Sequence, residues 1–142
     1  MKNIIAVDIG GTNSRFAHFE LDDDGTLRHV NGLRLKTGDA GSLEELIEMA
    51  RGAGSMAAGT MWDAVVLAVP GAVKKDTYAK LANVPWAVDV SGLRQRSGTT
   101  KIFLINDFVA QAYSCPLEAQ LKKETIQPGQ AEEGATRAVI GA

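Results

Sequence analysis

The sequence lacks the features that mark secreted, metal-binding and membrane-spanning proteins. Cys115 is the only cysteine, so no disulfide can form within the chain and a cysteine-based metal site is disfavoured. The apolar run that precedes Asp8 covers four residues, which is far too short for a signal sequence or a membrane span. We therefore expect a cytoplasmic protein that makes no contact with a membrane.

Neither sign of charge dominates the sequence. The chain has 15 basic and 17 acidic residues, a formal net charge of -2, and these residues are scattered along it. This distribution offers no electrostatic footprint for nucleic acid or an anionic lipid surface, so a small-molecule partner is expected. The hydrophobic content of 45% is typical of globular proteins, and 142 residues suit one domain but are few for a two-lobed enzyme.

The pattern of apolar residues predicts an α/β fold. Residues 4–9, 15–21 and 26–35 are separated by turn signals and predict an antiparallel meander. Ser42 opens a capping box, and Leu43, Leu46, Ile47 and Ala50 then form one apolar helical stripe. The continuous apolar runs at 64–69 and 102–105 are typical of central strands covered on both faces. We expect short helices near 89–96 and after 107, the second ended by Pro116, and a further strand at 138–140. The predicted fold is ribonuclease-H-like: a mixed sheet with an antiparallel three-strand meander followed by parallel strands, with helices on both faces.

The glycine turn after the first strand is a candidate phosphate site. Consecutive glycines leave backbone N–H groups free of side-chain bulk, which is what a polyphosphate requires. The candidate residues are Gly10, Gly11, Thr12 and Asn13 as donors, Arg15 as a cation, and Asp8 as a ligand of a water on a phosphate-bound Mg²⁺. The alternative is an ordinary hairpin whose glycines serve only for positive φ. The Walker and dinucleotide motifs, G-x-x-x-x-G-K-[ST] and G-x-G-x-x-G, are absent.

A carboxylate follows the second apolar run. Asp107 would project from the carboxyl edge of the sheet, where open α/β folds bind ligands, and a helix N-terminus would keep it ionised and able to accept a proton. Asn106 carries both donors and acceptors, which suits a sugar diol. Alternatively, either residue is simply the helix N-cap.

Two of these segments resemble a known family. V-D-I-G-G-T-N at 7–13 resembles the first phosphate motif of the actin, Hsp70 and hexokinase superfamily, in the form typical of bacterial glucokinases. L-I-N-D-F-V-A at 104–110 is similar to the glucokinase segment in which the Asp is the catalytic base and the preceding Asn binds the sugar. Two weaker matches, at 68–71 and 82–86, resemble loops beside the sugar, although Pro70-Gly71 can equally be a plain turn and Trp86 a core aromatic. The resemblance implies Asp107 as catalytic base and Asn106, Asn83, Pro70 and Gly71 as sugar contacts.

The resemblance also implies an activity and an incomplete chain. The expected reaction is ATP-dependent phosphorylation of glucose, or a similar hexose, at the 6-hydroxyl, with ATP and Mg²⁺ as cofactors. Residues 1–142 would form the N-terminal lobe, while the family's second phosphate loop and its Glu- and His-containing sugar segment are absent, so the isolated chain should be inactive. The resemblance leaves room for a homodimer of the full-length protein. The alternative is a non-catalytic sugar- or nucleotide-sensing module on the same fold. His18 and His29 have no partners at metal-ligand spacing and are interpreted as structural or surface residues.

Overall fold

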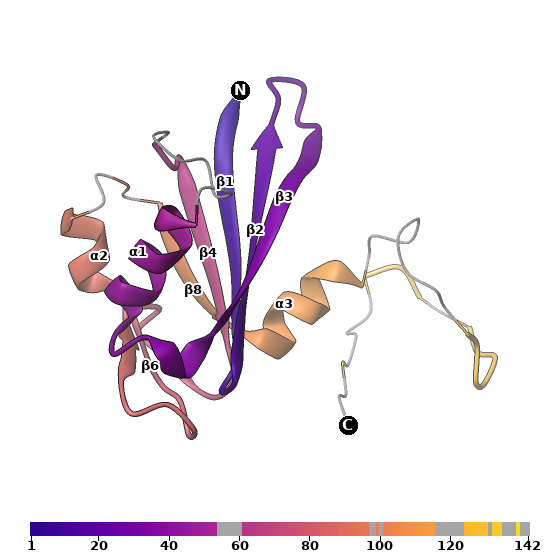
Figure 1. Ribbon diagram of the computed structural model, residues 1–142. Coiled ribbons are helices and arrows are strands. Elements are labelled where there is room, and N and C mark those ends of the chain that lie inside the picture. Colours follow the sequence, from indigo (N-terminus) through magenta and orange to yellow (C-terminus); the bar gives the residue numbers. More distant parts are fainter. Residues whose placement is uncertain are drawn as a thin grey trace.

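A five-stranded mixed sheet forms the centre of the computed structural model, which describes residues 1–53, 61–96, 99, 101–115, 124–130, 132–134 and 139. The strand order is β3-β2-β1-β4-β8 (Figure 1). β1 (Lys2–Ile9), β2 (Asn13–Leu21) and β3 (Leu27–Lys36) form the antiparallel meander, and β4 (Ala64–Val69) and β8 (Ile102–Asn106) continue the sheet parallel to β1. The predicted α/β fold with a mixed sheet is confirmed.

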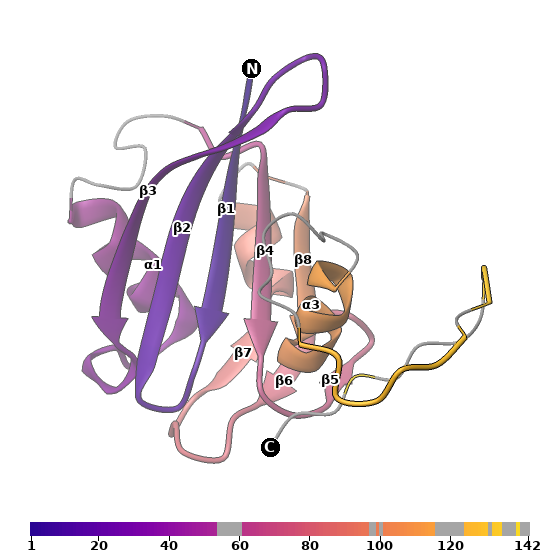
Figure 2. The same cartoon turned by 90° about the vertical axis from the view of Figure 1, so that its right-hand side faces the viewer.

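Helices lie on both sides of this sheet. α1 (Leu43–Gly52) and α2 (Ser91–Arg96) are on one side and α3 (Asp107–Ser114) is on the other (Figures 1 and 2). A short 3-10 helix, η1 (Thr37–Asp39), connects β3 to α1, and β5 (Val73–Lys74), β6 (Tyr78–Lys80) and β7 (Ala87–Asp89) form a small antiparallel sheet. The predicted helices near 89–96 and after 107 are therefore both present.

The main core lies between the sheet and α1. Alternate side chains of a strand point to the same face, and those pointing toward α1 are buried. The buried residues of β1, β4 and β8 are Ile5, Val7, Ile9, Val65, Leu67, Val69, Ile102 and Leu104. From the helix, the predicted stripe of Leu43, Leu46, Ile47 and Ala50 is buried as well. Burial of this stripe stabilises α1, and the Ser42 hydroxyl oxygen caps it by accepting from the Glu45 N–H at 3.1 Å.

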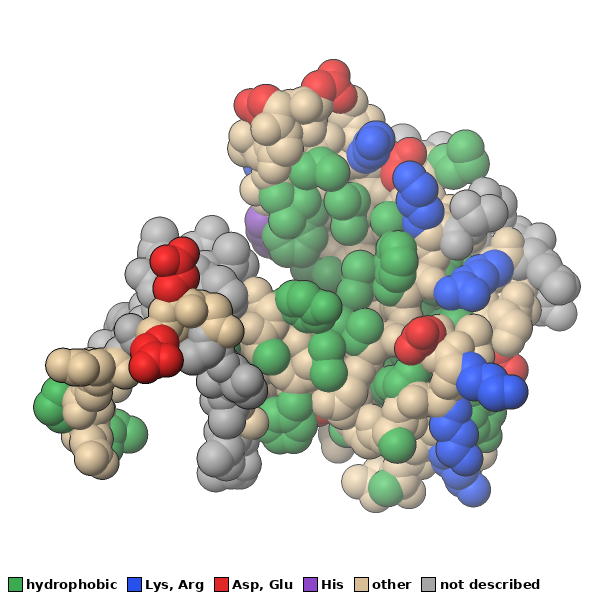
Figure 3. Space-filling model, turned by 180° about the vertical axis from the view of Figure 1, so that it is seen from behind, with side chains coloured by type: hydrophobic (Ala, Val, Ile, Leu, Met, Phe, Trp, Pro, Cys, Tyr) green, Lys and Arg blue, Asp and Glu red, His purple; other side chains and the backbone are tan. Residues whose placement is uncertain are grey.

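The opposite face of the sheet is only partly covered. α3 crosses one end of it, no residue of α3 is buried, and Phe103 of β8 is 53% exposed. Figure 3 shows hydrophobic side chains gathered in the middle of the view from behind, with Lys and Arg side chains along one side. The prediction that residues 102–105 form a central strand covered on both faces was wrong for the described part of the chain, where β8 is an edge strand. A continuous apolar run indicates that a strand has hydrophobic side chains on both faces, but it does not indicate where that strand lies in the sheet.

Several smaller predictions can be compared with the structure. His18 is buried and hydrogen-bonded through Nε2 to Asn3 Oδ1 at 2.9 Å, and His29 is exposed on β3, so both are structural or surface residues. Hydrogen bonds from Ser91 lower the pKa of the Asp89 carboxyl, which accepts from the backbone N–H at the start of α2.

Pro116 and most of the predicted strand at 138–140 lie outside the described residues, and Val139, which is described, is not in a strand. None of the helices in the described ranges is long and apolar enough to cross a membrane.

Candidate active site

The candidate residues meet at one edge of the sheet. β1, β4 and β8 are parallel neighbours, so their carboxyl ends lie side by side, and Figure 2 shows β1 and β4 ending at the same edge. β1 leads into the turn at 10–13, β4 leads into Pro70 and Gly71, and β8 ends at Asn106. Because Val69 pairs with Asn106 in the register of the sheet, the loops after β4 and β8 begin next to each other. This edge is where an open α/β sheet binds ligands.

The glycine turn leaves backbone donors unused. The Gly10 N–H donates to Asn13 O at 3.0 Å and closes the turn. Among the described residues, the N–H groups of Gly11 and Thr12 have no acceptor, so they remain for a bound anion. The turn therefore has the donors that a phosphate group requires.

The glycines of this turn are required for space and not for backbone angle. Positive φ is found at Gly25, Gly71 and Gly134 among the described glycines, but not at Gly10 or Gly11, which corrects the expectation that a hairpin here would use them for positive φ. A Cβ on Gly10 would lie 2.9 Å from Asn13 O, and a Cβ on Gly11 would lie 3.1 Å from the Cβ of Asn83. A side chain at position 10 would therefore clash with the backbone, and one at position 11 would require Asn83 to shift.

A buried threonine, which sequence reasoning missed, holds the backbone of the turn by hydrogen bonds. Thr37 is fully buried in η1, its N–H donates to Thr12 O at 3.0 Å, and its hydroxyl donates to Gly10 O at 2.7 Å. Ser14 Oγ lies 2.8 Å from Thr37 Oγ1, and because the single hydroxyl hydrogen of Thr37 goes to Gly10, Ser14 is the donor of this second bond. Nothing in the local sequence distinguishes Thr37 from any polar residue at the end of a strand.

Asp8 and Arg15 lie beside the turn and pair with each other. They are opposite one another in the register of β1 and β2, and Arg15 Nη1 is 3.1 Å from Asp8 Oδ2. Both side chains are at least half exposed, so this ion pair contributes little stability. The second carboxylate oxygen of Asp8 remains for a water on a metal ion. No cluster of three or more potential metal-ligating side chains exists in the described parts of the chain.

The loops after β4 and β6 close a cavity against the turn. This cavity has a volume of about 240 Å³ and is lined by Gly11, Pro70, Gly71, Lys80, Leu81, Ala82 and Asn83. The structure thus brings the weaker sequence matches into contact with the glycine turn. Lys80 is a cation of this cavity that sequence reasoning missed. Trp86, by contrast, is 9% exposed and its Nε1–H donates to Ala40 O at 2.7 Å, so it is a core aromatic and not part of the cleft.

The junction between β8 and α3 holds the two polar residues at 106 and 107. Asn106 is the N-cap of α3, and its Oδ1 accepts from the Phe108 N–H at 2.9 Å. Its Nδ2 donates to Gly71 O at 2.9 Å. Asp107 is the first helical residue, and its Oδ1 also accepts from the Phe108 N–H, at 2.9 Å. Within the described residues Oδ2 of Asp107 has no hydrogen-bond partner, so one carboxylate oxygen is available to a ligand.

The chain is similar to known glucokinases in sequence and in structure. A family model described as Glucokinase matches residues 5–142. The glucokinase of Caulobacter vibrioides is 36% identical over 110 residues, which are 77% of this chain and 31% of that protein. The crystal structure of a glucokinase from an Antarctic psychrotroph superposes with a TM-score of 0.72 at 28% identity, over 95% of this chain and 41% of the other. The glucokinase of Balamuthia mandrillaris, solved in complex with glucose, superposes with a TM-score of 0.58 at 24% identity, over 80% of this chain and 32% of the other.

These comparisons agree on the family and on the extent of the match. The family model covers almost the whole chain, while the chain spans about a third of the length of the first curated relative. The glycine turn and the Asn106-Asp107 pair, which first indicated the resemblance, lie together at one edge of the sheet. The chain belongs to the glucokinase family.

Proposed function

We propose that residues 1–142 form the N-terminal lobe of a two-lobed kinase that transfers the γ-phosphoryl group of ATP to the 6-hydroxyl of glucose or a similar hexose. The observation that carries this proposal is the convergence of the glycine turn, the loop at Pro70 and Gly71, and the Asn106-Asp107 junction at the carboxyl ends of three parallel strands. Membership of the glucokinase family supports the reaction class. The single cysteine and the need for ATP favour the cytoplasm as its compartment.

In this proposal Asp107 is the general base. Phosphoryl transfer to an alcohol requires a carboxylate that accepts the hydroxyl proton as the new bond forms. The Phe108 N–H holds Oδ1 of Asp107 at 2.9 Å, which orients the carboxylate and leaves Oδ2 for the sugar hydroxyl.

The glycine turn binds the phosphates of ATP in this proposal. The N–H groups of Gly11 and Thr12, with the Thr12 hydroxyl and the Asn13 amide, are the proposed donors. Asp8 would hold a water on a phosphate-bound Mg²⁺, which would neutralise the phosphate charge. Arg15 would help to orient Asp8 through their ion pair and add a positive charge near the phosphates.

The sugar is proposed to lie between the three loops. The cavity beside Gly11 is lined by Asn83, Pro70 and Gly71. Because Asn106 is hydrogen-bonded to Gly71, these four proposed sugar contacts form one continuous surface. Glucose is the preferred substrate because of the family, and dimerisation of the full-length protein stays a prediction.

An Asp107→Asn variant of the full-length protein tests this proposal. We expect glucose-dependent ADP release to be abolished while glucose affinity stays within about tenfold of the unmodified protein, because the amide keeps the shape of the side chain but cannot take the proton. Asp23→Asn, in the turn between β2 and β3, is the matched control because Asp23 is 96% exposed and far from the proposed site in the fold. Substantial turnover in Asp107→Asn would disprove the base assignment. An unmodified protein that binds glucose or ATP without turnover would instead support a sensing module.

A further inference from the structure

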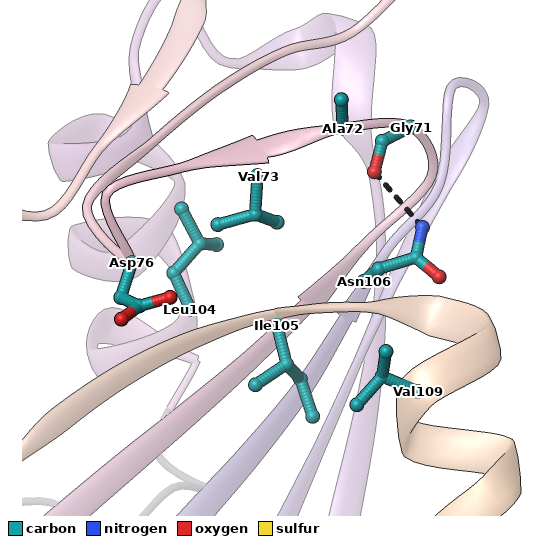
Figure 4. A pocket seen from close by; sticks show the side chains of 8 residues that line it. All are labelled: Gly71, Ala72, Val73, Asp76, Leu104, Ile105, Asn106 and Val109. Atoms are coloured by element: carbon teal, nitrogen blue, oxygen red, sulfur yellow. Dashed lines mark hydrogen bonds between the residues drawn. The ribbon is translucent and has the colours of Figure 1, made fainter.

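A single side chain ties together two loops of the proposed site. We propose that Asn106 is a positioning residue: it fixes the loop at Gly71 relative to α3 and, through this, presents only an acceptor to the cleft. The inference rests on the proposed function for its kinetic part, whereas its structural part concerns the loop alone. Figure 4 shows Asn106 reaching from the end of β8 to the backbone of Gly71.

The two neighbours of the Asn106 amide determine its orientation. The Phe108 N–H is a donor and therefore requires Oδ1, at 2.9 Å, while the Gly71 carbonyl is an acceptor and requires Nδ2, also at 2.9 Å. Rotating the amide by half a turn would place two donors together at α3 and two acceptors together at Gly71. Nδ2 also donates to Val69 O at the longer distance of 3.5 Å. The amide is thus held at both ends.

The hydrogen bond from Asn106 Nδ2 to Gly71 O, called the tether below, holds a residue that shapes two cavities. Its φ of +98° lies in the left-handed region that favours glycine, so the loop turns sharply there. Gly71 lines the cavity of about 240 Å³ beside the glycine turn and also a second, larger cavity of about 540 Å³ between the β5 loop and α3. Figure 4 shows this second cavity, with Val73, Leu104 and Val109 around it. Movement of Gly71 would therefore change the shape of both cavities.

The tether also limits what Asn106 can do for a ligand. An amide oxygen has two lone pairs, and Phe108 uses one of them, so one remains for a sugar hydroxyl. Nδ2 is directed at the backbone carbonyls of Val69, the last residue of β4, and of Gly71, which leaves Oδ1 as the amide atom available to a ligand. Asn106 can consequently accept one hydrogen bond from the substrate while it orients both Gly71 and the helix that carries Asp107.

An Asn106→Asp variant of the full-length protein separates the tether from the other roles of this residue. A carboxylate keeps the cap on Phe108 and an acceptor for a hydroxyl, but it places an oxygen against the Gly71 carbonyl where Nδ2 donates now. We expect amide hydrogen exchange in the peptide that contains residues 71–73 to become about tenfold faster without any substrate, because the loop loses its tether. We also expect the KM for glucose to rise about tenfold while the KM for ATP stays within about twofold.

Two further variants complete the test. Gln111→Glu is the matched amide-to-carboxylate control, since Gln111 is exposed on α3, and it should change neither exchange nor KM. Gly71→Ala strains the same loop, because the φ of +98° at residue 71 favours glycine. The double variant with Asn106→Asp should therefore raise the KM for glucose by less than the product of the two single effects. Unchanged exchange at 71–73 in Asn106→Asp overturns the tether. Faster exchange with an unchanged KM for glucose overturns the positioning role. Failure of the unmodified protein to phosphorylate glucose would remove the proposed function, but the exchange result would still decide the tether.

Discussion

Replacing Thr37 by valine should weaken both the fold and the glycine turn. Valine keeps the size and branching of threonine but removes the hydroxyl, so Gly10 O loses its donor and the buried Ser14 hydroxyl loses its acceptor. Two hydrogen bonds at about 1 kcal/mol each predict a loss of about 2 kcal/mol in the free energy of unfolding, or roughly a 30-fold fall in the folding equilibrium constant. Urea denaturation followed by tryptophan fluorescence measures this, because Trp62 and Trp86 are both buried.

Two other variants make the Thr37 experiment decisive. Ser14→Ala combined with Thr37→Val should cost less than the sum of the single variants, because the unpaired Ser14 hydroxyl is removed together with its acceptor. Thr125→Val, at an exposed position, is the control for the substitution itself and should leave stability within about 0.5 kcal/mol of the original chain. A Thr37→Val chain as stable as this control would refute the reasoning that the buried hydroxyls support the turn.

Two further predictions concern ligand binding. Gly11→Val in the full-length protein should weaken ATP-Mg²⁺ binding by about tenfold without unfolding the lobe, because the side chain would press against Asn83 and fill the cavity next to the free N–H groups; calorimetry that finds an unchanged affinity would reduce the turn to a bare hairpin. The isolated 142-residue chain should bind ATP and glucose no better than about millimolar and release no ADP, because a few hydrogen bonds of about 0.5–1.5 kcal/mol each barely offset an association cost of at least about 4 kcal/mol. Glucose-dependent ADP release that disappears in Asp107→Asn would show instead that the chain is a complete enzyme.

Local sequence patterns predicted the strands of the main sheet and the three α-helices, but not η1 or β7. Apolar runs between turn signals predicted β1 to β3, the continuous apolar run at 64–69 predicted β4, and the period-3.6 apolar stripe predicted α1, all close to their observed positions. The glycine turn and the Asn106-Asp107 pair could be singled out as candidate site residues for a similar reason: each is a short contiguous segment of the sequence. The family followed from the same two segments.

The tertiary structure decided everything that depends on contacts between distant segments. Thr37 supports the glycine turn from 27 residues away, and the Asn106 amide reaches a carbonyl 35 residues earlier. A Cβ on Gly11 would lie 3.1 Å from the Cβ of Asn83, whereas local sequence suggested that a backbone angle required the glycine. Among the described strands β8 lies at the edge of the sheet; this position depends on which strands pair, and the apolar content of a strand does not contain that information. A sequence states which groups are available, but hydrogen bonds and steric contacts between loops exist only after the sheet has placed those loops at one edge.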